Sequence, residues 1–177
     1  GAVLPKRIPL FPLSTAVLFP RALMPLYVFE ARYRAMLKDC LASGGLMAMG
    51  LLEEGDSVRP LCGIGRIVRH DPHADGTSHL LLLGECRARI FSTLPTGPYL
   101  TAILEVLEEP AVPGGAAEAA RLRLMALLRS IAGREGKIPL AKLLKGRPGP
   151  GALADFAASS FLRHPAQRQE ILECLDP

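Results

Sequence analysis

The 177-residue sequence lacks tryptophan, and aromatic residues make up only 5% of it. Proteins that bind single-stranded nucleic acid stack bases on aromatic side chains, so a stacking platform is not expected here. Blocks of five or more like charges are also absent. The net charge of +4 and the pI of about 9.1 permit a nucleic-acid partner without indicating one. RNA or other nucleic-acid binding is therefore kept only as an alternative function.

Long hydrophobic runs are missing too. The longest stretch without a charged residue is 90–104, 15 residues that Pro95 and Pro98 interrupt. A helix that spans a membrane needs about 18 or more apolar residues. Lys6 and Arg7 precede a proline-rich run without a cleavage-type site, so no signal peptide is expected. The sequence predicts a cytoplasmic protein with no membrane partner.

The four cysteines form no Cys-x-x-Cys pair. Zinc sites and dithiol redox sites use such closely spaced cysteines, so neither is expected. A chain of this length buries enough surface to fold without disulfides. Because free cysteines behave as small apolar residues, we predict buried free thiols at Cys40, Cys62, Cys86 and Cys174.

Motifs for catalysis are likewise missing. A phosphate-binding loop needs Gly-x-x-x-x-Gly-Lys-Ser/Thr, but Ile138 follows Gly136-Lys137 and no glycine precedes them at the required spacing. The pair Gly63-x-Gly65 lacks a third glycine and a following helix, so we interpret it as relief of crowding in a strand. A serine nucleophile needs an activating base, and none stands at a fixed spacing. We predict no enzymatic activity, no catalytic residues and no cofactor; an undetected hydrolase is the competing hypothesis.

The segment "HDPHAD" supplies four potential metal ligands: His70, Asp71, His73 and Asp75. Imidazole and carboxylate groups bind transition metals. The same residue types are typical of a polar hairpin tip, because Asp-Gly favours a tight turn. We favour the hairpin tip and predict no metal site.

Prolines punctuate the apolar N-terminal part of the chain. Segments 8–13, 16–19 and 23–29 contain or adjoin prolines. Proline breaks helices and is confined to strand starts, edges and bulges, so these segments are predicted to be short and extended. From residue 30 the apolar residues recur at helical spacing until Gly44 and Gly45, which predicts one helix among the strands.

The middle of the chain is rich in strand signals. Ranges 62–70 and 79–91 flank an Asp-Gly turn signal, and 99–107 alternates in the same way. Several short strands at this spacing predict a small β-barrel, which with its inserted helix occupies residues 1–109.

Four arginines fall on these predicted strands. In "GECRARI", small or apolar residues alternate with Glu85, Arg87 and Arg89, so these three side chains are expected to face water. Together with Arg66 and Arg69 the two arginines would form a basic face able to neutralise phosphates. We favour a solvated sheet face over a nucleic-acid site.

The hydrophobic period changes after "EEPAVPGGAA" at 108–117, which reads as a linker. Residues 118–132, residues 152–163 and a segment that starts at Pro165 follow helical periodicity. The first of these helices is apolar over so much of its surface that it is expected to pack on two sides. An α+β fold is therefore predicted, with a helical bundle subdomain at 110–177.

Several motifs resemble one known family. "PLFPL", "VLFP" and "MPLYVFEARYRAML" are similar to the start of the substrate-binding domain of Lon-type ATP-dependent proteases. The resemblance continues in "GIGRIV", in "LLGECRARI" and in "LADFAASSFLRHPAQRQEILECLD". Two positions depart from the family pattern. Arg21 stands where glycine is usual, so a different bend is expected there, and Ala88 stands where an aromatic residue is common.

The resemblance implies a PUA-like β-barrel followed by helices, in a stand-alone form without the ATPase and protease domains of full-length Lon. It also implies binding of unfolded or partly folded polypeptides, with an ATP-dependent protease as a further partner in proteolysis and protein quality control. An extended segment outside its own ladder offers backbone to a peptide.

Five apolar residues are predicted to bind polypeptide: Phe11, Leu13, Phe19, Leu23 and Tyr27. The alternative is that this stretch is entirely core and linker, because composition does not separate buried from exposed apolar residues.

Overall fold

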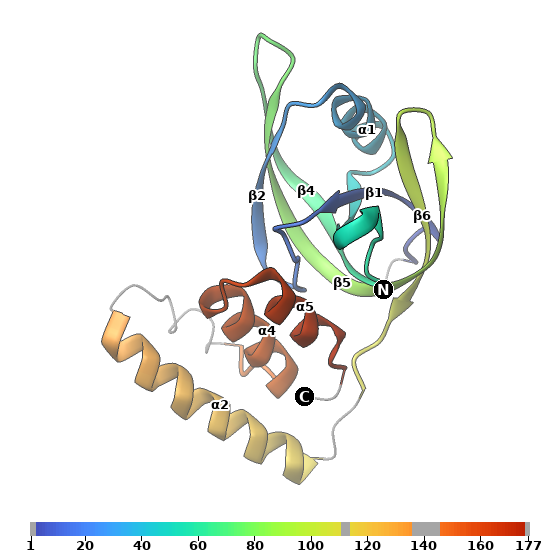
Figure 1. Cartoon of the computed structure of the whole chain (residues 1–177). Coiled ribbons are helices and arrows are strands. Elements are labelled where there is room, and N and C mark those ends of the chain that lie inside the picture. Colours follow the sequence, from blue (N-terminus) through green and yellow to red (C-terminus); the bar gives the residue numbers. More distant parts are fainter. Residues whose placement is uncertain (1–2, 111–113, 136–145, 176–177) are drawn as a thin grey trace.

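The computed structural model describes residues 3–110, 114–135 and 146–175 (Figure 1). Its strands are β1 (Arg7–Leu13), β2 (Leu23–Val28), β3 (Leu46–Leu51), β4 (Leu61–Pro72), β5 (Ser78–Thr96) and β6 (Tyr99–Leu107). Its helices are α1 (Ala31–Ala42), the 3₁₀ turn η1 (Glu54–Asp56), α2 (Gly114–Glu135), α4 (Pro150–Phe161) and α5 (Pro165–Glu173). The predicted α+β class is confirmed.

The six strands form one sheet whose pairing closes on itself. The strand order is β2-β5-β4-β3-β1-β6, and β6 also pairs with β5, so five strands complete a ring. β1 and β3 are parallel, and the other pairs are antiparallel. Among the described strands β2 pairs with β5 alone, so it lies outside the ring with one free edge (Figure 1).

One apolar cluster fills the inside of this ring. Each of the five strands contributes a small or branched side chain to it, namely Ile8, Ala48, Ile64, Ala88 and Ala102. Ala88, at the position where the resemblance predicts an aromatic residue, is fully buried there.

A second cluster, called the α1 cluster below, lies between the sheet and α1. Tyr33, Met36, Leu37 and Cys40 of α1 face it, as the helical spacing predicts. Residues of β1, β2, β3 and β5 meet them from the sheet. Every residue of β3 is buried, because the strand lies between the two clusters. This double burial accounts for its uninterrupted apolar sequence.

The loop between β1 and β2 crosses closely over two strands. Its Val17, Leu18 and Phe19 are buried but form no strand, so the predicted extended segment 16–19 is loop. A Cβ atom on Gly63 would lie 2.0 Å from the Leu18 carbonyl oxygen, and one on Gly84 would lie 1.9 Å from that of Phe19. Any larger residue would displace the loop, which confirms that Gly63 relieves crowding.

Arg21 ends this loop in a glycine-type conformation. Its φ of 65° lies in the left-handed region, where a side chain costs roughly 1–2 kcal/mol. Its N–H donates to the Gly84 carbonyl oxygen at 2.8 Å, which fixes the bend against β5. The arginine therefore adopts a backbone conformation that glycine favours. A bend that differs from that of the family stays a prediction.

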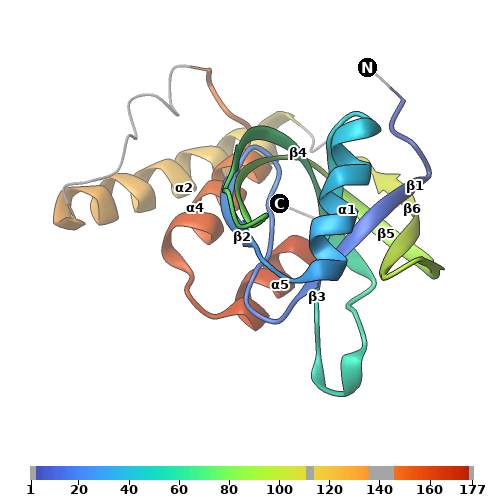
Figure 2. The same ribbon diagram turned by 90° about the horizontal axis from the view of Figure 1, so that it is seen from above.

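The C-terminal helices stack below the sheet. α4 and α5 contact each other and α5 contacts β4, while α2 packs mainly against α4 on the side away from the sheet (Figures 1 and 2). α2 begins at Gly114, inside the predicted linker. Leu122 and Leu127 of α2 are more than half exposed, so the predicted packing of this helix on two sides is wrong for the described chain.

No helix within the described ranges is both long enough and apolar enough to cross a bilayer.

Candidate polypeptide-binding surface

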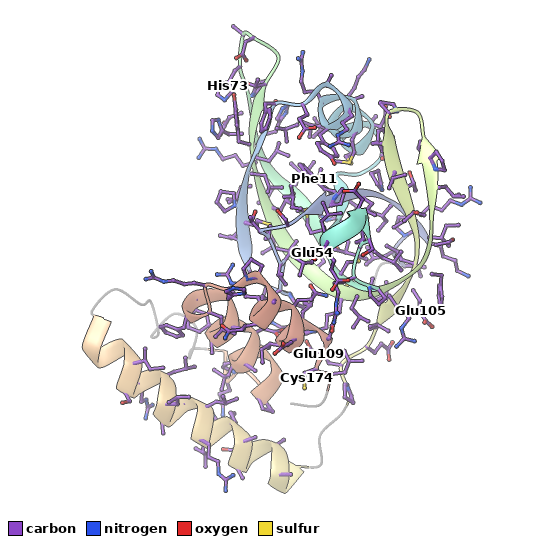
Figure 3. The ribbon with its side chains drawn as sticks, viewed as in Figure 1. Phe11, Glu54, His73, Glu105, Glu109 and Cys174 are labelled. Atoms are coloured by element: carbon purple, nitrogen blue, oxygen red, sulfur yellow. The ribbon has the colours of Figure 1, made fainter. Side chains whose placement is uncertain are left out.

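The structure separates the five residues that were predicted to bind polypeptide. Phe11 is 4% exposed, and its ring lies in the core (Figure 3). Phe19 is 1% exposed, so its ring is buried as well. Leu13 is half-buried beside the α1 cluster. Only Leu23 and Tyr27, at 60% and 47% exposed, present apolar surface to solvent. Two of the five positions therefore lie on the surface, and the apolar stretch is mostly core.

Strand alternation explains this division along β2. Met24, Leu26 and Val28 turn toward the α1 cluster, whereas Leu23 and Tyr27 lie on the opposite face. Because successive side chains of a strand point to opposite faces, an apolar strand beside a single core must expose half of its side chains.

The exposed side of β2 continues onto its neighbours. Phe29 follows the same alternation and is 57% exposed. Leu83 and His79 of β5 are the register partners of Leu23 and Tyr27, and both are exposed. We call these residues with Pro25 the β2 outer face: Leu23, Pro25, Tyr27, Phe29, His79 and Leu83.

Ring stacking orders the aromatic end of the β2 outer face. The Tyr27 and Phe29 ring centroids lie 5.6 Å apart, and those of Tyr27 and His79 lie 4.8 Å apart. His73, at the tip of the β4–β5 hairpin, contacts His79 through its Nε2 atom, 2.6 Å from His79 Nδ1 (Figure 3). The exposed rings are thus held in place before any partner arrives, which lowers the entropy cost of binding.

Sequence reasoning missed Phe29, His79 and Leu83. A signal existed for Phe29, because residues 23, 25, 27 and 29 share one alternation. No signal existed for Leu83, since the run at 80–83 is apolar at every position and does not reveal which side faces water.

The predicted basic face is largely neutralised. Arg66 forms an ion pair with Glu85 and donates from Nη1 to the Gly44 carbonyl oxygen at 2.8 Å. Arg69 Nε lies 2.7 Å from Asp71 Oδ2. Each of these two arginines therefore has a carboxylate partner within the domain.

The hairpin tip uses its polar side chains internally. His70 Nε2 and Ser78 Oγ lie 3.1 Å apart. Asp75 accepts hydrogen bonds from the Thr77 hydroxyl and backbone N–H, which hold the pKa of its carboxyl below the usual value. Within the described ranges, no three or more His, Cys, Asp or Glu side chains are grouped so as to hold a metal ion.

The cysteines differ in burial. Cys40 and Cys62 are buried, and desolvation raises the pKa of each thiol to about 12. Cys86 is half-buried, and burial followed by the charge of Glu85 raises its pKa to about 11. Cys174 is exposed near the end of α5, so its predicted burial is wrong (Figure 3).

A buried charge cluster joins the helices to the sheet. Arg87 was predicted to face water, yet its side chain is 6% exposed. Its Nη1 donates to Asp155 Oδ2 and to Glu109 Oε1, both at 3.1 Å, and its Nε donates to the Leu172 carbonyl oxygen at 2.8 Å. Arg21 Nη2 lies 3.4 Å from both carboxylates. The prediction failed because α4 and α5 cover this part of β5.

A second ion pair holds α5 to the loop before β4. Arg59 Nε donates to Glu173 Oε1 at 2.8 Å, and Arg59 Nη1 donates to Glu53 Oε1 at 3.1 Å. The Gln169 amide bridges Glu173 and the Leu61 carbonyl oxygen. Glu173 accepts hydrogen bonds from Arg59 and Gln169. The bond from Arg59 has the larger effect, and both lower the pKa of the Glu173 carboxyl below the usual value.

A comparison with protein families gives one match over most of the chain. Residues 7–177 match the model of the ATP-dependent protease La (LON) substrate-binding domain. The Lon protease of Dictyoglomus thermophilum is 29% identical over 181 residues, which cover 98% of this chain and 23% of that protein. The Lon protease of Desulfosudis oleivorans is 25% identical over 183 residues, with 98% and 22% covered. The chain therefore spans less than a quarter of the length of these relatives.

Solved structures share the fold. The N-terminal domain of a Mycobacterium avium complex Lon protease superposes with a TM-score of 0.76 at 19% identity, covering 96% of this chain and 91% of that one. A Lon N-terminal domain protein from Xanthomonas campestris gives a TM-score of 0.71 at 24% identity, covering 97% and 92%.

Proposed function

Because this chain belongs to the LON substrate-binding domain family, we propose that it binds unfolded or partly folded polypeptides through the β2 outer face. The observation that carries the proposal is the exposure of Leu23 and Tyr27 on β2 and of Phe29 directly after it. Large apolar side chains that gather on one surface mark interaction sites more often than isolated ones do.

Apolar contact supplies most of the binding free energy in this proposal. A micromolar dissociation constant corresponds to about 8 kcal/mol. At about 25 cal/mol per Å² removed from water, several hundred Å² of apolar surface must be buried. Ordering a disordered partner offsets part of this gain, so weak binding with little sequence preference beyond apolar and aromatic content is expected.

The test is a titration of a fluorescent, reduced and unfolded model protein with the purified domain at low and at molar salt. We expect micromolar binding that salt leaves nearly intact, because the ion pairs near the surface are internal to the domain. Tyr27→Ala should weaken binding roughly fivefold, the effect of losing about 1 kcal/mol of apolar contact.

A matched control is available in Phe91→Ala. Phe91 is 65% exposed but lines a separate groove with residues 3–6 and β6. We expect this variant to bind like the wild type. Absence of polypeptide binding at high micromolar concentration would contradict the proposal, and so would binding that salt alone abolishes. Salt-sensitive binding of RNA would instead favour the nucleic-acid alternative.

We interpret the architecture as two subdomains, a PUA-like β-barrel at 1–109 and a helical bundle at 110–177. The closed strand pairing supports the first, and the change to helices after Leu107 supports the second. Mild proteolysis should cut first near residues 108–117. First cuts within β4 or β5 would argue against this division.

In the cell, the domain is proposed to deliver clients to an ATP-dependent protease in protein quality control, without catalysis of its own. The names of the relatives support this role. Affinity capture from native cytosol, with mass spectrometry, should recover such a protease together with clients. Steady ATP hydrolysis or casein cleavage by the pure domain would contradict the non-catalytic part.

A further inference from the structure

The free edge of β2 has a defined hydrogen-bonding polarity. Gly84 N–H donates to the Ala22 carbonyl oxygen at 2.8 Å, and these residues continue the register in which Leu23 faces Leu83. In an antiparallel ladder, hydrogen-bonded and non-hydrogen-bonded pairs alternate. The Ala22 carbonyl and the backbone polar groups of residues 24, 26 and 28 are therefore directed toward β5, and those of residues 23, 25 and 27 toward the free edge. The Ala22 N–H donates instead to the Phe19 carbonyl oxygen at 3.2 Å.

Pro25 occupies the central one of these outward positions. It has no N–H, so the edge offers donors only at Leu23 and Tyr27, about 13 Å apart at roughly 3.3 Å per residue. The ladder with β5 loses nothing, because the missing donor would point away from β5. A proline one residue earlier or later would remove a bond to β5 instead.

This edge borders an exposed apolar part of the sheet. Leu23, Tyr27 and Phe29 are each about half exposed or more. An exposed apolar edge strand is a template for pairing with another chain, and proline at the edge opposes such pairing. The pairing partner that this edge fits best is a second copy of β2, because isologous contact brings the two β2 outer faces together.

We propose that Pro25 guards the free edge of β2 against strand addition, so that the domain does not self-associate there and engages polypeptides through side chains alone. The self-association part stands independently, and the binding-mode part rests on the proposed function. Pro25 is in this sense a specificity-determining residue. It prevents two copies of the domain from pairing through β2, and it leaves the side chains of the β2 outer face accessible to a polypeptide.

The first test compares Pro25→Val with the wild type by analytical ultracentrifugation over a concentration series. Restoring the donor should lower the dimer dissociation constant at least about tenfold, since isologous pairing restores one hydrogen bond from each protomer and each is worth up to about that factor. Leu94→Val, which raises strand propensity at an exposed position of β5 outside the β2 outer face, should remain like the wild type. Pro25→Ala repeats the test should the valine variant fold poorly. Wild-type behaviour of both Pro25 variants would overturn the proposal.

The second test uses an apolar peptide and a version N-methylated at alternate residues, which cannot form a ladder. Wild-type protein should bind both within about twofold, because it uses no ladder hydrogen bonds, whereas Pro25→Val should favour the unmethylated peptide about tenfold. A tenfold preference already present in the wild type would overturn the binding mode. If neither peptide binds any variant, the proposed function fails, and the ultracentrifugation result alone decides the role of Pro25.

Discussion

The sheet of this domain buries a charged region and exposes an apolar one. Around Arg87, the outer surface of β5 is covered by α4 and α5, and its charge is matched by Asp155 and Glu109. Around Tyr27, the outer surface of β2 and β5 is left uncovered by the described chain. Fold stability would favour the reverse arrangement, since desolvating charge costs free energy and burying apolar surface releases it. The uncovered region is therefore where a role beyond stability is to be sought.

The largest effect is expected from truncating the Phe19 side chain, which lies in the region that α4 and α5 cover. Its ring is 1% exposed and packs with Leu51, Ala158 and Leu172 between the sheet and the helices. Phe19→Ala should lower the free energy of unfolding by about 3–5 kcal/mol. Urea unfolding measures this loss, and Tyr27→Ala serves as the exposed aromatic control. A loss below about 1 kcal/mol would show that the covered region is not core.

An effect of similar size is expected from removing one partner of the buried charge pair. Asp155→Ala leaves Arg87 buried beside only the half-exposed Glu109, and removing one partner of a buried pair costs about 3–5 kcal/mol. The same urea experiment applies. Glu109→Gln should cost less, because Glu109 is the more exposed partner. Equal losses for the two variants would contradict the ranking of these contacts by burial.

A smaller effect is expected from pH at Glu173. Its folded pKa is depressed by Arg59, so the ion pair contributes stability above the unfolded pKa, and this stability is lost as pH falls through the folded pKa. Partial exposure limits the contribution to about 1 kcal/mol or less. Glu173→Gln should therefore destabilise the protein at neutral pH and converge with the wild type in acid. A constant difference across this range would assign the effect to packing instead.

Much of the fold could be predicted from local patterns. The helical spacing of Tyr33, Met36, Leu37 and Cys40 located the face of α1 that packs on the sheet, because period and burial coincide on a one-sided helix. The Asp75-Gly76 signal located the β4–β5 hairpin, in which Gly76 has a φ of 84°.

What could not be predicted depends on contacts that are distant in sequence. Arg87 and Arg89 share one alternation, yet α4 and α5 bury the first and leave the second exposed. Phe19 and Tyr27 are both aromatic residues within two positions of a proline, and only the placement of the helices sends one to the core. Periodicity reports which side of a strand a residue occupies, and it does not report what covers that side.

The most direct test of the central claim is to map the contact surface by NMR. Methyl and amide resonances of the domain would be followed while an unfolded, unlabelled polypeptide is added. The account predicts shifts at Leu23, Tyr27, Phe29 and Leu83, with little change at Phe91 or at Leu122 of α2. Shifts that cluster at Phe91 or along α2, with the β2 outer face unchanged, would contradict it.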